Sequence, residues 1–592
     1  MLTNVNDFFK TNKKFFYGFC KSMKIQSYQN NNIAFKSSQV NIVSMADNHG
    51  DLLSMPQMMK TIQVNKKDLF EKASDKSTAN VLAIAGDFFM NPSKKGFFTN
   101  PEFCNGDVQY NFLNKMIYTA KMAVGLKNNF EAVYTPGNHC FDGGDEWLFE
   151  KLQRAPMTTI LTNVDRTHSP LADRLIRDEE NFCTYKVLNI PDSKHPEKVN
   201  KVMILGVTIP TMNYYNPGLL EKTKFYDNSN KNDANLEEKN LRKTIRVIRY
   251  NVAKFKKKNP DGAVVVMAHT GNKISALMAE KIPEINLILN GHDHKEFEVL
   301  KGQTMILSHG QSSKFLRSVQ LKFDDNGKLS EIKSRRVDTE RYEKMARRDA
   351  KMQDFLKVNI QQDLVPLVHF KDDSGKVEEL VLDDSIRYSN NVLANYVTSA
   401  IKRAVRKEYP DIDVVGIPST IFRNGLKSNE KRSTFNNLDL MKMFDGVSEN
   451  LSLVRIGKVK GEYLHELVLE NTLNNLKSKT RNAMIQWSDI QVNRTLIRKI
   501  HEGKSDADYT DAIKIRNSKT KEFEKIDFNK DYTVLMSDKY LVKDTSNIKV
   551  PAKIRDNFVK IPESYDTLFR KYLEMINYDV KITDKIREER IL

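Results

Sequence analysis

TPGNHCFDGG, residues 135–144, begins where a short apolar run, Ala132–Thr135, ends. Glycine, asparagine and aspartate are typical of tight turns, so this stretch alone is compatible with a simple surface turn. It also gathers an amide, an imidazole and a carboxylate among glycines, which allow the backbone to approach a ligand closely. The rest of the sequence has to decide between a turn and a binding site.

Four other apolar runs end in the same kinds of residue. The segments that follow them are Asp47-Asn48-His49-Gly50, Gly86-Asp87, His269 and Asn290-Gly291-His292-Asp293-His294. One such segment is more often a turn or a helix cap than a metal site. In an open α/β sheet, however, ligands bind at the carboxyl ends of the strands. We therefore expect all five segments, although far apart in sequence, to converge on one site.

Short apolar runs alternate with helical patterns from residue 40 to residue 325, which predicts an α/β sheet buried on both faces. The expected strands are Val40–Ala46, Val81–Ala85, Ala132–Thr135, Thr159–Thr162, Val202–Val207, Ala263–Ala268, Ile285–Leu289, Thr304–Ser308 and Val319–Phe323. Helical patterns between them include Gln109–Leu126 and Leu236–Lys257. Asp324-Asp325-Asn326-Gly327 resembles the start of a calcium loop, but the remaining ligands are missing, and we expect a hairpin turn.

A charged segment, Thr339–Leu364, is predicted to form one linker helix that ends before Pro366. The helices expected after it are Asn391–Glu408, Leu438–Phe444 and Gly461–Asn474, and the strands are Val414–Ile417, Leu451–Val459 and Tyr532–Met536. This pattern predicts a second α/β or α+β domain. The expected division is a helical N-terminal extension (1–37), a first domain (38–338), the linker helix (339–365) and a second domain (366–592).

The residue types of the five segments suit a divalent metal. Zn, Mn, Co and Fe take imidazole and carboxylate ligands. Two metals about 3.5–4 Å apart need a bridging carboxylate, for which Asp87 is the natural candidate. Asp47, His49 and one histidine of the last pair would complete one metal site. Asn138, His269 and the other histidine of that pair would complete the second.

The remaining histidines and the cysteines show no such pattern. We expect ordinary roles for the six other histidines, His168, His195, His309, His369, His465 and His501. The four cysteines, Cys20, Cys104, Cys140 and Cys183, form no CxxC pair. This disfavours a zinc–cysteine site or a disulfide scaffold and suits a reducing compartment.

In this order, the five segments resemble the motifs of the calcineurin-like metallophosphoesterases: D-x-H, GD, GNH, a lone His and GHxH. GNHCFDGG is similar to the GNHEFD signature of the 5′-nucleotidase branch, which includes 2′,3′-cyclic phosphodiesterases. Further similar segments are Ile160–Val164 and Leu205–Pro210 in the first half, and Asn395–Val397, Phe422-Arg423, Leu438–Leu440, Leu451–Ile456 and Gly461–Leu464 in the second. The resemblance covers about residues 38–550.

The resemblance implies a four-layer α/β/β/α metallophosphoesterase catalytic domain followed by an α+β 5′-nucleotidase-type substrate-binding domain. It implies two divalent metals, one held by Asp47, His49, Asp87 and His294 and the other by Asp87, Asn138, His269 and His292. His139 and Asp142 match the family's catalytic dyad, and Arg423 matches its substrate-binding arginine. The implied activity is hydrolysis of a phosphate monoester, preferably a nucleotide, by a metal-bridging hydroxide.

Several departures leave the substrate open. The glycines before the family's arginine are replaced by Pro418-Ser419-Thr420-Ile421, and the two aromatic residues that stack on the nucleobase have no clear counterpart. Trp487 or Tyr540 are candidate replacements, although core packing suits either of them. A non-nucleotide or cyclic phosphate ester is therefore the alternative substrate class, as for a phosphodiesterase or a sugar phosphatase. Cys140 stands where relatives usually carry glutamate.

Composition and the N-terminal sequence bear on membrane association and on the cellular location. The 592-residue chain has no apolar run of about 18 residues, so we expect no transmembrane helix. The N-terminus lacks the apolar core of a secretory signal. We therefore expect a cytoplasmic protein, or a periplasmic or secreted one if a signal was removed. The aromatic and lysine residues of the extension suit a helix docked on the first domain or a basic helix at a membrane surface.

The net charge of +18 has two readings. It reflects either a Lys- and Asn-rich composition with a solvated surface, or an anionic partner such as nucleic acid. A basic partner-binding protein with an idle metal site is the distant alternative function, and the oligomeric state stays open.

Overall fold

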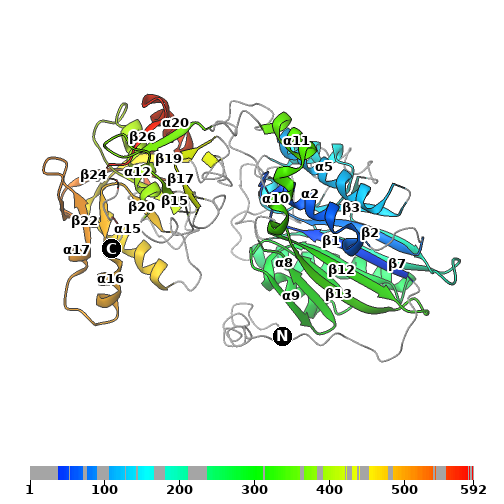
Figure 1. The fold of residues 1–592 in the computed structure, drawn as a ribbon. Coiled ribbons are helices and arrows are strands. Elements are labelled where there is room, and N and C mark those ends of the chain that lie inside the picture. Colours follow the sequence, from blue (N-terminus) through cyan, green and yellow to red (C-terminus); the bar gives the residue numbers. More distant parts are fainter. Residues whose placement is uncertain are drawn as a thin grey trace, which may run out of the picture.

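The computed structural model describes most of the chain from residue 38 onward (Figure 1). The described residues are 38–52, 54–70, 76–89, 106–126, 128–141, 144–165, 181–210, 236–310, 314–360, 366–382, 391–419, Phe422, 430–436, 439–440, 453–477, 484–537, Leu541, 555–583, Ile586 and Arg590. The expected N-terminal extension, Asp142, Arg423 and Tyr540 lie outside them.

A seven-stranded sheet forms one half of the first domain. Its strands, in the order β13-β12-β1-β2-β3-β4-β5, are β13 (Leu329–Asp338), β12 (Phe315–Phe323), β1 (Ser38–Met45), β2 (Thr78–Ala85), β3 (Phe130–Thr135), β4 (Thr158–Ile160) and β5 (Phe182–Cys183). β1 to β5 run parallel, and β12 and β13 extend the sheet in antiparallel fashion. All residues of β1 and β2 are buried, as expected for strands covered on both faces.

A six-stranded sheet forms the other half. Its strands, in the order β10-β11-β9-β8-β7-β6, are β10 (Phe297–Lys301), β11 (Thr304–Ser308), β9 (Leu287–Asn290), β8 (Ala263–His269), β7 (Val199–Thr208) and β6 (Tyr185–Pro191). Side chains of the two sheets, among them Val81, Val265 and Leu289, form a shared core between them. β11, β9, β8 and β7 are parallel, with antiparallel strands at both edges.

Helices cover the outer face of each sheet (Figure 1). α2 (Met55–Val64), α5 (Asp107–Val124) and α6 (Asp145–Arg154) contribute to the core on the first sheet. α8 (Leu236–Lys258) and α9 (Gly271–Lys281) pack on the second sheet. The four-layer α/β/β/α arrangement implied by the resemblance is therefore confirmed.

The expected strands of this region all correspond to observed ones, with ends that differ by a few residues. The sequence patterns missed β5, β6, β10 and β13, which lie at sheet edges and are partly exposed. β5 has only two residues, and the other three lack a continuous apolar run. The hairpin turn between β12 and β13 is confirmed. There the Gly327 amide donates to the Asp324 carbonyl at 2.9 Å, and the Asp324 carboxylate accepts from the amides of Asn326 and Lys328.

The prediction of one linker helix over Thr339–Leu364 is wrong. The segment forms a 3-10 turn, η5 (Glu340–Tyr342), and two α-helices, α10 (Glu343–Arg348) and α11 (Ala350–Ile360). The break falls at Asp349, whose backbone is extended at φ −81° and ψ 106°. Its carboxylate accepts from the Met352 amide at 3.2 Å and from Lys60 Nζ at 2.7 Å. Asp349 thus caps α11 and ties the linker to α2, a role for which aspartate is favoured over continuing the helix.

The second domain is built around a five-stranded sheet. Its strands, in the order β20-β16-β24-β19-β25, are β20 (Ile485–Trp487), β16 (Ile412–Pro418), β24 (Asp531–Ser537), β19 (Leu453–Lys460) and β25 (Phe558–Ser564). α12 (Val392–Val405) and α20 (Tyr565–Met575) form one core with this sheet. α15 (Gly461–Lys477) and the small sheet β21 (Ile490–Val492), β22 (Ile513–Arg516) and β23 (Phe523–Lys525) form another. The expected helix Leu438–Phe444 is described only at Asp439 and Leu440.

Trp487 belongs to this second core and is 5% exposed. A Cβ on Gly416 would stand 2.4 Å from its ring, so the indole is packed directly against the neighbouring strand. Trp487 is therefore a core residue and does not replace a base-stacking aromatic. Among the helices that the structure describes, none is long and apolar enough to cross a membrane.

Candidate metal centre

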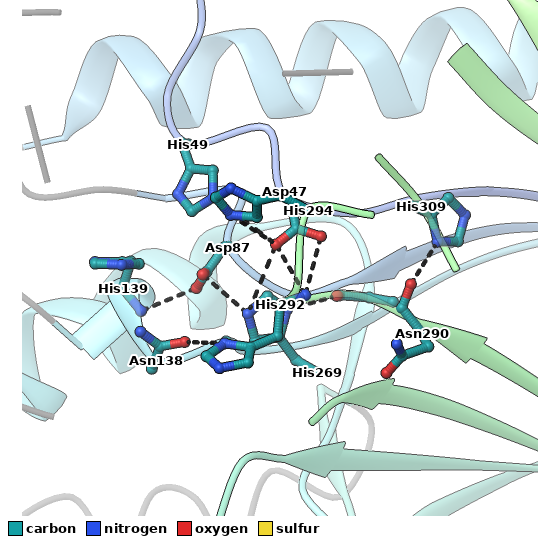
Figure 2. A network of polar contacts seen from close by, with 12 residues as sticks. Asp47, His49, Asp87, Asn138, His139, His269, Asn290, His292, His294 and His309 are labelled. Carbon is teal, nitrogen blue, oxygen red and sulfur yellow. Dashed lines mark hydrogen bonds and ion pairs between the residues drawn. The ribbon is translucent and has the colours of Figure 1, made fainter. Parts of the chain in front are cut away.

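The five sequence segments meet at the carboxyl ends of strands in both sheets (Figure 2). β1, β2 and β3 lie side by side in the first sheet, and β8 and β9 lie side by side in the second. Backbone hydrogen bonds join the first two loops, from the Asp47 amide to the Gly86 carbonyl at 3.2 Å and from the His49 amide to the Asp87 carbonyl at 2.7 Å. The expected convergence therefore occurs, because the carboxyl ends of neighbouring parallel strands lie at the same edge of each sheet.

The backbone is strained at the residues that converge. Nine described residues other than glycine have positive φ, and five of them belong to the site: Asp47 (54°), His49 (52°), Asp87 (47°), His292 (91°) and His294 (54°). Such a conformation costs about 1–3 kcal/mol for each residue and concentrates at functional sites. The site therefore fixes side-chain directions that an ordinary turn would not select.

Three glycines leave room for the converging side chains. A Cβ on Gly86 would lie 2.2 Å from His269 Nδ1, and one on Gly137 would lie 2.2 Å from Asp87 Oδ1. A Cβ on Gly291 would lie 2.7 Å from Asp47 Oδ2. Gly86 also has a φ of 88°, so a side chain there would be strained as well as obstructed. These glycines of GD, GNH and GHDH are thus required by close packing around the carboxylates.

One group of ligand atoms gathers around Asp47. His49 Nε2 and His294 Nε2 face each other at 2.8 Å, and they lie 3.8 Å and 3.5 Å from Asp47 Oδ1. The His292 amide donates to both carboxylate oxygens of Asp47, at 3.0 and 3.1 Å, and fixes its orientation. Two imidazole nitrogens and a carboxylate oxygen aimed at one point form a donor set that suits a borderline divalent metal.

A second group gathers around Asp87 and His269, which are both buried. His269 Nε2 lies 2.9 Å from Asp87 Oδ2 and 3.9 Å from Asp47 Oδ1. Its other nitrogen donates to the Ala85 carbonyl at 2.9 Å, which fixes the ring with Nε2 directed at the carboxylates. His292 Nδ1 contacts Asn138 Oδ1 at 3.0 Å, and the His292 ring lies edge-on to the His269 ring at 5.4 Å.

Ligand atoms in each of three groups lie within 4.8 Å of one another: Asp47, His49 and His294; Asp47, Asp87 and His269; and His49, Asp87 and His139. Five of the seven residues expected to hold metal belong to these groups, and the other two, Asn138 and His292, contact each other beside His269. His139 joins the cluster although the resemblance assigns it to catalysis.

Burial and neighbouring charges shift the pKa values of several residues in the cluster. It raises the pKa of Asp47 to about 7, against the attraction of His269. Burial also acts to raise the pKa of Asp87, but His269 and the other histidines outweigh this and hold the pKa well below its usual range. Burial lowers the pKa of His269, but Asp87 and Asp47 overcome this and raise the pKa to about 9. The two buried carboxylates therefore favour a cation between them, and the donor set fits a divalent metal in that place.

His139 and Cys140 lie against Asp87. The His139 amide donates to Asp87 Oδ1 at 2.9 Å, and its half-buried ring lies edge-on to the His49 ring at 5.4 Å. Cys140 Sγ lies 3.8 Å from Asp87 Oδ1 and 2.9 Å from the Tyr134 hydroxyl. Burial, followed by the repulsion of Asp87, raises the pKa of the Cys140 thiol to about 12, so it is a neutral neighbour.

Two supporting residues were not singled out by the sequence. Asp293 lies between the histidines of the last pair, and its carboxylate accepts from the Asn272 amide at 2.7 Å in the first turn of α9. His309, expected to be ordinary, is buried between Ser44 Oγ at 2.8 Å and the Asn290 carbonyl at 2.9 Å. It directly follows β11, so the strand-end pattern would have found it.

Comparison with known families identifies the first domain. The sequence profile of the calcineurin-like phosphoesterases matches residues 40–296. Residues 40–296 form a calcineurin-like phosphoesterase domain. The chain is therefore a metal-dependent phosphoester hydrolase, and the matched segment contains every proposed metal ligand. No curated protein sequence matches the chain.

Solved structures share the fold of the phosphoesterase domain together with the second domain. A 5′-nucleotidase precursor from Thermus thermophilus superposes with a TM-score of 0.59 and 14% identity, covering 93% of this chain and 99% of that one. The sulfate thiohydrolase SoxB from the same species superposes with a TM-score of 0.55 and 13% identity, covering 96% and 97%. At these identities the likeness concerns the fold.

Proposed function

We propose that this phosphoesterase uses two divalent metal ions to hydrolyse a phosphate monoester, with a nucleotide as its substrate. The observation that carries the proposal is the convergence of two buried carboxylates, Asp47 and Asp87, with imidazole nitrogens from both sheets (Figure 2). Asp87 shares one group of ligand atoms with Asp47 and His269 and another with His49 and His139, so it lies near ligands proposed for both ions, which supports its role as the bridging carboxylate.

In this proposal one ion is held by Asp47, His49, Asp87 and His294, and the other by Asp87, Asn138, His269 and His292. Divalent ions supply Lewis-acid polarisation of the phosphoryl oxygens. The protein contributes fixed ligand directions, since the Ala85 carbonyl orients His269 and the His292 amide orients Asp47. Such outer contacts usually change metal affinity 10- to 100-fold, by the order of magnitude seen in other metal sites.

His139 is proposed to act on the leaving group. Its backbone is held by Asp87, and its half-buried ring lies beside His49. A half-buried imidazole at the edge of the cluster can donate a proton to the departing oxygen. Asp142, which lies outside the described residues, is proposed to orient this ring.

The identity of the substrate as a nucleotide has the least structural support in this proposal. Two-domain architecture supports a substrate held between a catalytic and a binding domain, with Arg423 as its proposed contact. The same fold also occurs in a sulfate thiohydrolase, so the fold alone does not select a nucleotide. With Trp487 committed to the core, a cyclic or non-nucleotide phosphate ester remains the second candidate.

A substrate panel with defined metal content tests the proposal. The chain is purified with Mn or Co, its bound metal is measured, and phosphate release is followed from 5′-mononucleotides, nucleotide sugars, cyclic phosphodiesters and a chromogenic ester. Nucleotide turnover above all other substrates supports the whole proposal. Turnover of other esters alone overturns the nucleotide assignment, and no turnover by the metal-loaded protein overturns the catalytic one.

A further inference from the structure

The outer face of α8 carries an unusual accumulation of positive charge. Nine of its described side chains are exposed, and seven of these are basic: Lys239, Arg242, Arg246, Arg249, Lys254, Lys257 and Lys258. The other two are Tyr250 and Ala253. We call these nine residues the α8 basic face. The opposite side of the helix, including Ile248, Val252 and Phe255, packs on the second sheet.

The charge pattern of this face differs from that of an ordinary solvent-exposed helix. Exposed helices usually interleave both charge signs, because opposite charges three or four residues apart stabilise the helix and like charges destabilise it. In α8 the like-charged pairs Arg242 with Arg246 and Lys254 with Lys258 fall at that spacing, although Arg242 also pairs with Glu238. α10 shows the ordinary pattern, since Glu343 pairs with Arg347 one turn later.

The basic side chains form a line. Arg242, Arg246, Arg249 and Lys257 are separated by three, four or eight positions, so they lie on nearly the same side of the helix and span about 22 Å of it. Arg249 also donates to the Lys281 carbonyl at the end of α9, at 2.9 Å. Three of the four are arginines in a chain whose first 150 residues contain none. Arginine binds phosphate groups through paired donors, which lysine does not.

Tyr250 distinguishes between the anionic partners that such a line fits. It follows Arg249 in the sequence and lies one helical turn after Arg246, with 64% of its surface exposed. Aromatic rings with a polar tip are favoured at the lipid–water boundary, among basic side chains that reach the headgroups. The line runs along the crest of one helix, which suits a flat surface, whereas single-stranded nucleic acid is usually held in a groove.

We propose that the α8 basic face binds the surface of an anionic lipid membrane, with its arginines on the lipid phosphates and Tyr250 at the headgroup level. Binding of this kind is peripheral and depends on salt, because charges on the surface attract basic residues only within a screening length. It is independent of the proposed metal chemistry, whose ligands lie at the ends of the strands.

Vesicle sedimentation of the full chain tests the proposal. Vesicles of phosphatidylcholine with phosphatidylglycerol are expected to retain the protein at low salt and release it at high salt, whereas phosphatidylcholine alone does not bind it. Arg246→Glu/Arg249→Glu should weaken binding at least about tenfold, because both lipid-facing charges are reversed. Lys254→Glu/Lys257→Glu, on the same face, should have a similar effect and serves as an independent variant.

A matched control separates this face from net charge. Arg498→Glu/Lys499→Glu changes the same number of charges on exposed positions of α16 (Arg494–His501) in the second domain. It should keep vesicle binding, and thermal unfolding verifies that all variants fold. Equal loss in the control, or no loss in the α8 variants, overturns the proposal. Selective loss of duplex DNA or single-stranded RNA binding, with unchanged vesicle binding, overturns it in favour of nucleic acid.

Discussion

Asp87 is the residue on which the proposed chemistry depends most directly. Asp87→Asn keeps the size of the side chain but removes the charge that faces His269 and the other ligands. We expect loss of metal-dependent turnover by at least about a thousandfold, together with loss of one metal ion per chain, since the bridging ligand is weakened. Metal content after gel filtration and phosphate release are the measurements. Full metal content with full turnover would show that Asp87 is not the bridge.

His139 provides the control for that substitution. It touches Asp87 through its backbone amide, so His139→Ala leaves this contact in place. We expect a lower rate, by about 10²–10⁴-fold as for other general acids, with the metal content unchanged. If His139→Ala strips the metal, the residue is a ligand, which its membership of a ligand group with His49 and Asp87 also permits.

His309 predicts a pH dependence that is separate from catalysis. Burial, together with the repulsion of Arg317, lowers its pKa to about 4, although the contacts with Asn290 and Ser44 act to raise it. The unfolded chain titrates at about 6.5, so it binds more protons than the native state between these values, and stability falls as the pH falls from about 6.5 to 4.

Between about pH 7.5 and pH 5, protonation of His309 in the unfolded chain should lower the free energy of unfolding by about 2 kcal/mol. His309→Gln removes the titrating group and should flatten the corresponding part of the pH profile. Urea unfolding of both proteins at several pH values measures the difference. A difference between them that does not change with pH would contradict the assignment.

The members of the proposed metal site could be predicted from the sequence because each lies at the end of a strand. Asp47, His49, Asp87, His269 and the last histidine pair all follow apolar runs, and parallel strands bring such ends together. The supporting contacts could not be predicted, because nothing in the sequence shows that Cys140 meets Tyr134 and Asp87, or that Asp293 accepts a hydrogen bond from the Asn272 amide of α9. Those contacts depend on loop conformations with positive φ, which residue type alone does not specify.

At the scale of elements, strands β12 and β13 support the loop that carries the last histidine pair. Arg317 of β12 is buried and donates to Glu298 at 2.8 Å and to Glu296 at 3.4 Å, and Glu296 lies two residues after His294. Arg336 of β13 also pairs with Glu296, and its guanidinium lies over the Phe315 ring at 4.5 Å. The strands beyond residue 296 therefore hold the loop that carries two of the proposed metal ligands.

Arg317→Gln should loosen this loop. We expect about 2 kcal/mol lower stability, because hydrogen bonds to charged groups are lost from a buried position. We also expect about tenfold weaker binding of Mn, the lower end of the usual effect of outer contacts. Calorimetric metal titration and chemical unfolding are the measurements.

Arg335→Gln is the matched control on the neighbouring strand. Arg335 is 51% exposed and pairs with Asp68 across the surface at 3.3 Å, an interaction that contributes little. Its loss should leave stability and metal affinity almost unchanged. Equal Mn affinity in the two variants would indicate that the backbone alone positions the loop.

The linker shows why the boundaries of some elements could not be predicted from the sequence. Thr339–Leu364 has helical composition throughout, yet Asp349 caps a new helix because Lys60 and the Met352 amide bind its carboxylate. The contact with Lys60 joins residues far apart in the sequence, so the sequence around Asp349 does not predict it. By contrast, Thr304–Ser308 matches β11 to the residue, since a buried parallel strand leaves a continuous apolar run.

At the scale of the whole molecule, the cores divide at the linker. Three described hydrophobic clusters contain residues up to Ile360, and the other two contain residues from Val368 onward. Separate cores favour separate unfolding, since few apolar contacts couple the two units. The chain has two tryptophans, Trp147 on α6 and Trp487 on β20, so each domain carries its own fluorescent reporter.

Metal binding should then stabilise one domain only. With Trp487→Phe, Trp147 reports the phosphoesterase domain, and Mn at 100 times its dissociation constant should add about 2.7 kcal/mol to its stability. This corresponds to a rise of roughly 2–4 °C per kcal/mol in its midpoint for a domain of this size. With Trp147→Phe, the midpoint reported by Trp487 should not move. Adding Asp87→Asn to the Trp487→Phe protein should abolish the first shift, whereas a common shift of both reporters would show that the two domains unfold as one cooperative unit.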